Sequence, residues 1–187
     1  MLFHIVLKDN NSYMIGSCDR VDPVSGVPIC GTCGYRTDPE FTSPAFQLRK
    51  KHFDFSSCYD GAVIVSERFQ VLYHSLGGSN MHFVNLSAAS GFYHLKCSQT
   101  ISLNYSAMGT RRLRPCSRCG RYLDVVGYSH VAPQPEARLS DNELAFSDWY
   151  FGSNNEASPL ILCGAGLAAA LRSSGISGID SCEPIGA

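Results

Sequence analysis

Two short copies of one motif constrain this chain more than any other feature of its 187 residues. The sequence CGTCG occupies residues 30–34 and CSRCG occupies residues 116–120. A CXXC turn can direct two sulfur atoms at one ion, and two such turns complete a tetrahedral site with Zn–S bonds of about 2.3 Å. The motif pair therefore predicts one structural zinc ion per chain, with four ligands: Cys30, Cys33, Cys116 and Cys119.

The residues around the cysteines support this interpretation. Gly34 and Gly120 each follow a second cysteine, and glycine there can adopt the positive φ that turns backbone N–H groups toward thiolates. A closed Cys₄ site has no open position for water or substrate, so we expect the metal to be structural rather than catalytic. The main alternative is a redox CXXC, which requires a helix at the motif; the residues after Cys33 lack that pattern. Unrelated core thiols are the other alternative.

Composition limits the remaining classes. The nine cysteines are an odd number, and the start MLFHIVLKDNNSY resembles a first strand rather than a signal peptide. Both observations argue against a disulfide framework and favour a cytoplasmic location. The formal net charge is −1, so bulk charge favours neither nucleic acid nor an acidic surface. No apolar run approaches the ~20 residues that span a bilayer, so no membrane partner is expected.

Two segments predict the same strand–helix–strand unit. In residues 60–86 and again in 158–185, a short apolar strand precedes a helix with apolar side chains at helical spacing, and glycine ends that helix. The rest is rich in β-branched and aromatic residues, which favours strands. We expect an α+β fold, mainly antiparallel sheet with two or more helices and a zinc-ribbon-like pair of knuckles. We predict a single zinc-stapled domain, 1–187, with two similar lobes, 1–110 and 111–187.

Catalytic signatures are absent from the sequence, which has no GXSXG, Walker A or HEXXH motif. Gly164 and Gly166 suggest a dinucleotide loop, but Ala169 occupies its third glycine position. His94 and Cys97 could form a second metal site with Cys58 or His52, although satisfied side chains on a strand explain them better. We therefore predict that the chain is not an enzyme, leaving a site assembled from dispersed histidines and acids as an alternative.

Two charged segments are candidate interaction surfaces. Residues 136–157 combine five acidic residues and one arginine with four aromatic residues, a composition that suits docking onto a basic protein surface. The candidate partner-binding residues in it are Asp141, Glu143, Asp148, Trp149 and Tyr150. The alternative is that these aromatic rings pack inward. Residues 110–121 contain five arginines, which could grip phosphates, although a solvated face is the favoured explanation.

Taken together, the two CXXCG units, the DWYFG segment and the C-terminal sequence PLILCGAGLAAALRSSGISGIDSCEPI resemble the double-CXXCG motif immunity proteins. Members of that family protect bacteria against polymorphic toxins delivered by contact. The resemblance implies that the four cysteines of the motifs are zinc ligands and that the chain binds and neutralises a cognate toxin. That toxin would be a nuclease or another enzyme that acts on nucleic acid. A nucleic-acid-binding zinc-ribbon protein or regulator is the alternative function.

Overall fold

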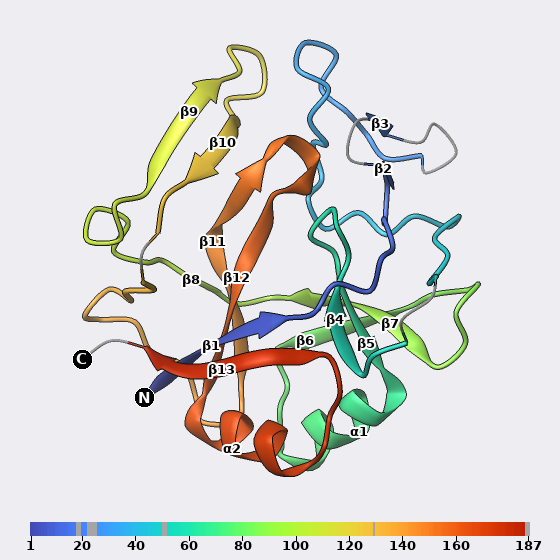
Figure 1. Cartoon of the computed structure of the whole chain (residues 1–187), viewed down its shortest axis with the longest axis vertical. Coiled ribbons are helices and arrows are strands. Elements are labelled where there is room, and N and C mark those ends of the chain that lie inside the picture. Colours follow the sequence, from blue (N-terminus) through green and yellow to red (C-terminus); the bar gives the residue numbers. More distant parts are fainter. Residues whose placement is uncertain (18–19, 22–25, 50–51, 129, 186–187) are drawn as a thin grey trace.

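Two mainly antiparallel sheets and two α-helices hold most of the regular secondary structure in the described part of the chain (Figure 1). The structure is a computed structural model that describes residues 1–187 except 18–19, 22–25, 50–51, 129 and 186–187. The predicted fold class, mainly antiparallel sheet with two helices, is confirmed.

The large sheet has the strand order β13-β1-β12-β11-β10-β9, and β8 pairs in parallel with β11. Its strands are β13 (Ile179–Ile185), β1 (Leu2–Leu7), β12 (Ser158–Gly164), β11 (Leu144–Ser153), β10 (Tyr122–Val126), β9 (Arg111–Pro115) and β8 (Thr100–Ile101). The small sheet has the order β4-β5-β7-β6. Its strands are β4 (Phe55–Ser57), β5 (Val63–Ser66), β7 (Phe92–Cys97) and β6 (Met81–Asn85). A separate pair contains β2 (Gly16–Ser17) and β3 (Arg20–Val21).

Helix α1 (Glu67–Ser75) forms where the sequence predicted it. The Ser66 hydroxyl caps its N-terminus by accepting a 3.3 Å hydrogen bond from the backbone N–H of Phe69. Phe69 and Tyr73, four residues apart, are the buried face of the helix. Gly77 follows with a φ of +81°, which ends the helix.

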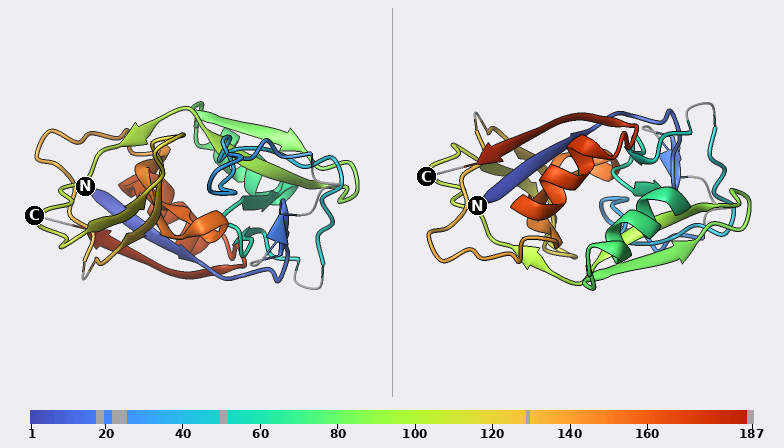
Figure 2. Two further views of the ribbon diagram at one scale, coloured as in Figure 1. Left: turned by 90° about the horizontal axis from the view of Figure 1, so that it is seen from above. Right: turned by 90° about the horizontal axis from the view of Figure 1, so that it is seen from below.

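Helix α2 (Ala165–Ser173) repeats this design after β12. Leu167 and Leu171 are buried at the positions in α2 that correspond to Phe69 and Tyr73 in α1. Gly175 follows with a φ of +67°. Gly164 stands at the N-cap, where a Cβ atom would lie 2.2 Å from the carbonyl oxygen of Ser140. Both predicted strand–helix–strand units are therefore present, and both helices lie at one end of the molecule (Figures 1 and 2).

The sheets share one topology around these helices. In the small sheet, the hairpin β4–β5 leads into α1 and then β6, and β7 lies between β5 and β6. In the large sheet, the hairpin β11–β12 leads into α2 and then β13, and β1 lies between β12 and β13. The two sets of four strands therefore have the same order and the same antiparallel pairing.

The strands that complete each set are exchanged between the two halves of the chain. β1 begins the first half but lies in the sheet of the second, whereas β7 begins the second half but lies in the sheet of the first. The chain after each exchanged strand pairs again with its own half. Asp9, after β1, forms a parallel bridge with Ser57 of β4, and Thr100, after β7, pairs in parallel with Phe146 of β11. The chain thus consists of two structural repeats, residues 1–86 and 92–185. Their boundary falls before β7, whereas the lobes 1–110 and 111–187 remain a prediction.

Strand exchange gives the repeats a common core. One buried apolar cluster contains residues from β1, β5, β7, β12, β13 and both helices. Examples are Phe3, Val65, Phe69, Leu95 and Leu167. Burial of such side chains contributes about 1.5–3 kcal/mol each. Neither repeat can therefore be separated without exposing this core.

Candidate metal centre

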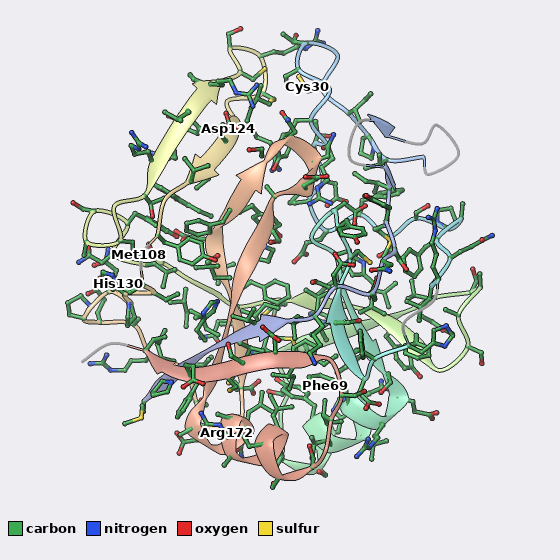
Figure 3. The ribbon with its side chains drawn as sticks, viewed as in Figure 1. Cys30, Phe69, Met108, Asp124, His130 and Arg172 are labelled. Atoms are coloured by element: carbon green, nitrogen blue, oxygen red, sulfur yellow. The ribbon has the colours of Figure 1, made fainter. Side chains whose placement is uncertain are left out.

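The four motif cysteines meet at the end of the molecule opposite the helices. Figure 3 shows Cys30 at this end, far from Phe69 and Arg172. All four Sγ atoms lie within 4.8 Å of one another. Cys30 Sγ is 4.0 Å from Cys116 Sγ, and Cys33 Sγ is 3.8 Å from Cys119 Sγ. Four sulfurs around a tetrahedral ion with 2.3 Å bonds are about 3.8 Å apart. The cluster can therefore hold one metal ion.

The two turns that present the sulfurs have the same backbone structure. In the first knuckle (residues 27–37), Cys30 N–H donates to Tyr35 O at 2.8 Å and Gly34 N–H donates to Cys30 O at 2.8 Å. The second knuckle (residues 113–122) repeats both bonds at 2.8 and 2.9 Å. Gly34 and Gly120 both have a φ of +72°, so the glycine of each motif takes the backbone conformation that its position predicted.

Backbone N–H groups favour the thiolate form of one cysteine in each turn. The N–H groups of Cys33 and Thr32 lower the pKa of Cys30 to about 6. In the second knuckle, the N–H groups of Cys119 and Arg118 lower the pKa of Cys116. Burial raises the pKa of Cys33, so a full set of thiolates requires a cation among them. This electrostatic arrangement suits metal ligands, which bind as thiolates.

The first knuckle is attached to the tip of the β11–β12 hairpin. The tip of that hairpin is the 3₁₀ helix η2 (Asn154–Glu156). Arg36 donates its backbone N–H to Asn155 Oδ1 at 2.8 Å and its Nη2 to Ala157 O at 2.9 Å. Asn155 Nδ2 donates in return to Gly34 O at 3.1 Å. These bonds hold the first knuckle on an element of the other repeat.

The second knuckle is an extension of the large sheet. β9 and β10 flank it, and β10 pairs with β11 at Asp124↔Ser153. Arg121 Nη2 also donates to Thr37 O of the first knuckle at 3.0 Å. Both knuckles are therefore fixed around the same hairpin tip, and their sulfurs lie together there.

Arg36 is the site residue that the sequence analysis did not identify. It is 2% exposed, although it stands in a polar turn where an exposed side chain is the ordinary expectation. We predict that Arg36→Ala lowers the free energy of unfolding by about 3 kcal/mol, because it leaves a cavity and an unpaired Ala157 carbonyl. Arg121→Ala, at a half-buried side chain, should cost less than about 1 kcal/mol. Urea denaturation of both variants measures this difference, and equal costs would contradict it.

The proposed partner-binding residues do not form one surface. Glu143, just before β11, accepts hydrogen bonds from Ser79 N–H at 3.1 Å and Oγ at 3.0 Å, and from Tyr73 OH. Asp141 is exposed beside α2, where its carbonyl accepts from Leu167 N–H at 2.9 Å. Both residues thus lie at the helix end of the molecule.

The other three candidates lie further along β11, about 20 Å away at 3.3 Å per residue. Asp148 accepts a hydrogen bond from Tyr105 OH. The Trp149 ring is half-buried, with the Tyr105 ring stacked on it at 3.6 Å and the Arg112 guanidinium over it at 4.1 Å. Burial raises the pKa of Tyr150 to about 12. The role of all five residues in partner binding stays a prediction.

The candidate second metal site is not assembled. His94 and Cys97 lie on β7, where His94 Nδ1 is 2.7 Å from Thr42 Oγ1 and Cys97 Sγ donates to Gln99 O at 3.0 Å. Among the residues that the structure describes, the four motif cysteines are the only group of three or more potential ligands close enough to hold a metal.

Comparison with known proteins gives no match to this chain, either among protein-family models or among curated proteins. In the described part of the chain, no helix is long and apolar enough to cross a membrane. The class of protein is therefore defined by its own architecture: two strand-exchanged repeats joined at a four-cysteine cluster.

Proposed function

We propose that the four-cysteine cluster binds one structural Zn²⁺ ion per chain. Four thiolates in tetrahedral reach are the donor set that zinc prefers, and such closed sites stabilise folds rather than activate water. The observation that carries the proposal is the meeting of Cys30, Cys33, Cys116 and Cys119 within 4.8 Å. The ion would join two knuckles that belong to different repeats.

We further propose that the chain is a cytoplasmic, non-enzymatic immunity protein that binds and neutralises a cognate bacterial toxin. Its support is the resemblance of the two CXXCG units and the C-terminal tail to the double-CXXCG motif immunity proteins. In such a protein the two distant CXXCG units would bind one metal ion together. Here the Sγ atoms of one unit lie 3.8 and 4.0 Å from those of the other. The toxin would be blocked by occlusion, which requires a stable surface rather than a reactive group.

Co-expression with the product of the adjacent gene tests this proposal. We expect cells to survive a toxin that kills them in the absence of this chain, and we expect the two proteins to purify as a complex. Zinc should be present at one ion per chain in that complex. Failure to rescue growth, with the zinc site filled, would contradict the immunity function without affecting the metal site.

A second candidate is nucleic-acid binding through the second knuckle. Every residue of β9 is exposed, including Arg111, Arg112 and Arg114, and β9 is the edge strand of the large sheet. Arg114 is paired with Asp124, however, and Arg112 lies over Tyr122 and Trp149. These contacts reduce the charge available to phosphates. Binding of RNA or DNA that weakens steeply with salt would favour this candidate.

A further inference from the structure

The two repeats treat one equivalent position differently. His94 on β7 lies opposite Ile64, and His4 on β1 lies opposite Leu162. Ile64 and Leu162 both stand two residues before the N-cap of the following helix. The two histidines therefore occupy the same place in the shared topology, on the sheet face that does not carry the helices. Each repeat can serve as a reference for the other.

On the small sheet, the chain itself covers the histidine. Thr42 Oγ1 is 2.7 Å from His94 Nδ1, and His94 is buried. Phe46 is buried in the same apolar cluster as Ile64, and Phe41 packs against that cluster. Residues 41–46 thus form a plug with a hydroxyl between two aromatic side chains. Burial lowers the pKa of His94 to about 3, so its ring is neutral under this plug.

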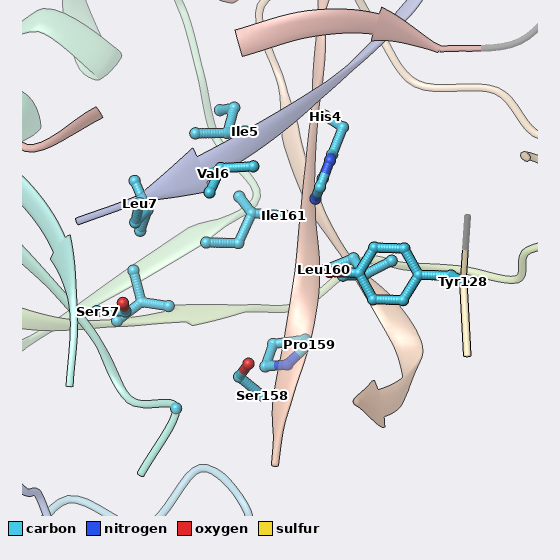
Figure 4. A pocket seen from close by; sticks show the side chains of 12 residues that line it. His4, Ile5, Val6, Leu7, Ser57, Tyr128, Ser158, Pro159, Leu160 and Ile161 are labelled. Carbon is cyan, nitrogen blue, oxygen red and sulfur yellow. The ribbon is translucent and has the colours of Figure 1, made fainter. Parts of the chain in front are cut away.

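On the large sheet, the corresponding segment does not cover the histidine. Tyr128 follows Cys119 by nine positions, as Thr42 follows Cys33. Tyr128 nevertheless leaves an open space beside His4, and in the described part of the chain the His4 imidazole makes no hydrogen bond. Figure 4 shows the His4 ring pointing from β1 toward Leu160 and Tyr128.

That space is a groove along β1. It consists of a cavity of about 160 Å³ and a larger one of about 920 Å³, both lined by His4 and Tyr128. Val6 and Tyr128, which line the groove, remain 38% and 45% exposed. We call this feature the β1 groove. Its apolar walls and its unbonded imidazole are the surfaces that the plug covers in the other repeat.

The rim of the β1 groove carries both signs of charge. Arg138 and Glu183 line the larger cavity, and both are exposed. An extended segment with an acidic end and a basic end is complementary to such a rim. Residues 38–49, which contain the plug, have this pattern, because Asp38 and Glu40 precede Thr42 and Arg49 follows it.

We propose that the β1 groove binds an extended segment of a partner protein that places a Thr or Ser hydroxyl against His4 and aromatic side chains along Val6 and Tyr128. Residues 41–46 show the required chemistry at His94. Burial also lowers the pKa of His4, so its neutral ring can accept a hydrogen bond from that hydroxyl. The inference concerns a surface that the toxin hypothesis does not specify.

A labelled synthetic peptide of residues 38–49 is the probe for this site. Titrated into the full-length protein, it should bind saturably and should shift the NMR signals of the His4 ring. Thr42→Val in the peptide should weaken binding about fivefold, the loss of one hydrogen bond of about 1 kcal/mol. Lack of saturable binding at millimolar peptide would overturn the proposal.

A pair of valine variants assigns the binding to the groove. Val6→Lys should weaken peptide binding at least about tenfold, because it places a charge in the apolar wall. Val71→Lys, on the exposed face of α1, is the matched control, since Val71 is 63% exposed and lines neither cavity. It should leave affinity unchanged. Equal effects of the two substitutions, or none from Val6→Lys in a protein with an unchanged melting temperature, would overturn the assignment. No toxin is present, so the result is independent of the proposed immunity function.

Discussion

Cys30→Ser is expected to abolish metal binding and to destabilise the whole molecule rather than one turn. The first knuckle belongs to one repeat and the second to the other. An ion bound by both knuckles would therefore close the chain between Cys33 and Cys116 into a loop. A structural zinc site in small peptides contributes about 10–16 kcal/mol of apparent binding free energy. We expect Cys30→Ser to lower the free energy of unfolding by on the order of 5 kcal/mol, which approaches the total stability of an ordinary domain. Metal analysis and thermal unfolding of the purified variant measure both effects.

Cys182→Ala provides the matched control for Cys30→Ser. Cys182 is a buried cysteine of β13 outside the four-cysteine cluster, so the Cys182→Ala protein should bind one zinc ion and should lose about 1 kcal/mol of unfolding free energy through the cavity. A chelator should reproduce the Cys30→Ser phenotype in the unmodified chain. A Cys30→Ser protein with normal zinc content and an unchanged melting temperature would show that the four-cysteine cluster does not hold the fold together.

The turns of the four-cysteine cluster were predictable because the information that specifies each turn is local. A CXXCG unit specifies the turn, the glycine conformation and the direction of two sulfurs within five residues, and both copies have this structure. The strand–helix–strand units were predictable for the same reason, since a serine or glycine N-cap, an apolar stripe and a terminal glycine lie next to one another.

The exchange of β1 and β7 could not be read from such patterns. An apolar strand has the same composition whichever sheet receives it, so the sequence of residues 2–7 does not say whether they pair with β12 and β13. Arg36 was missed because its burial depends on Asn155 and Ala157, which are distant in the sequence. The hydrogen bonds that Glu143 accepts from Tyr73, Ser79 and Asn80 could not be predicted either, because all three residues are distant in the sequence, and its role in partner binding stays a prediction.

Removing two carboxylates that join the repeats should produce the second large effect. Asp54, just before β4, accepts hydrogen bonds at Oδ2 from Ser177 N–H at 3.0 Å and from Ser177 Oγ at 2.8 Å. Glu143, just before β11, makes the equivalent pair with Ser79. Each acid precedes the first strand of one hairpin and binds the loop after the helix of the other repeat. We call these two carboxylate–serine contacts clamps. They are related by the same symmetry as the strands.

We predict that Asp54→Asn and Glu143→Gln each lower the free energy of unfolding by about 2 kcal/mol at pH 7, because hydrogen bonds to charged groups contribute about 1.5–3 kcal/mol. The double variant should lose about 4 kcal/mol if the clamps act independently. Glu136→Gln, at an exposed acid, is the control and should change stability by less than about 0.5 kcal/mol. Urea denaturation of the four variants and of the unmodified chain measures these changes in the free energy of unfolding.

The pH dependence of stability separates the charge of the clamps from their shape. Burial alone would raise the pKa of Asp54 and Glu143, but hydrogen bonds from Ser177 and Ser66 lower the pKa of Asp54, and those from Tyr73 and Ser79 lower the pKa of Glu143. An acid with a lower pKa in the folded state stabilises fully above its unfolded pKa of about 4, and that contribution is lost as pH falls through the folded value. Unfolding free energy should therefore decline below about pH 4.5 in the unmodified chain and decline less in the double variant. Parallel pH curves for the two proteins would contradict this prediction and would show that the two carboxylates carry no stabilising charge.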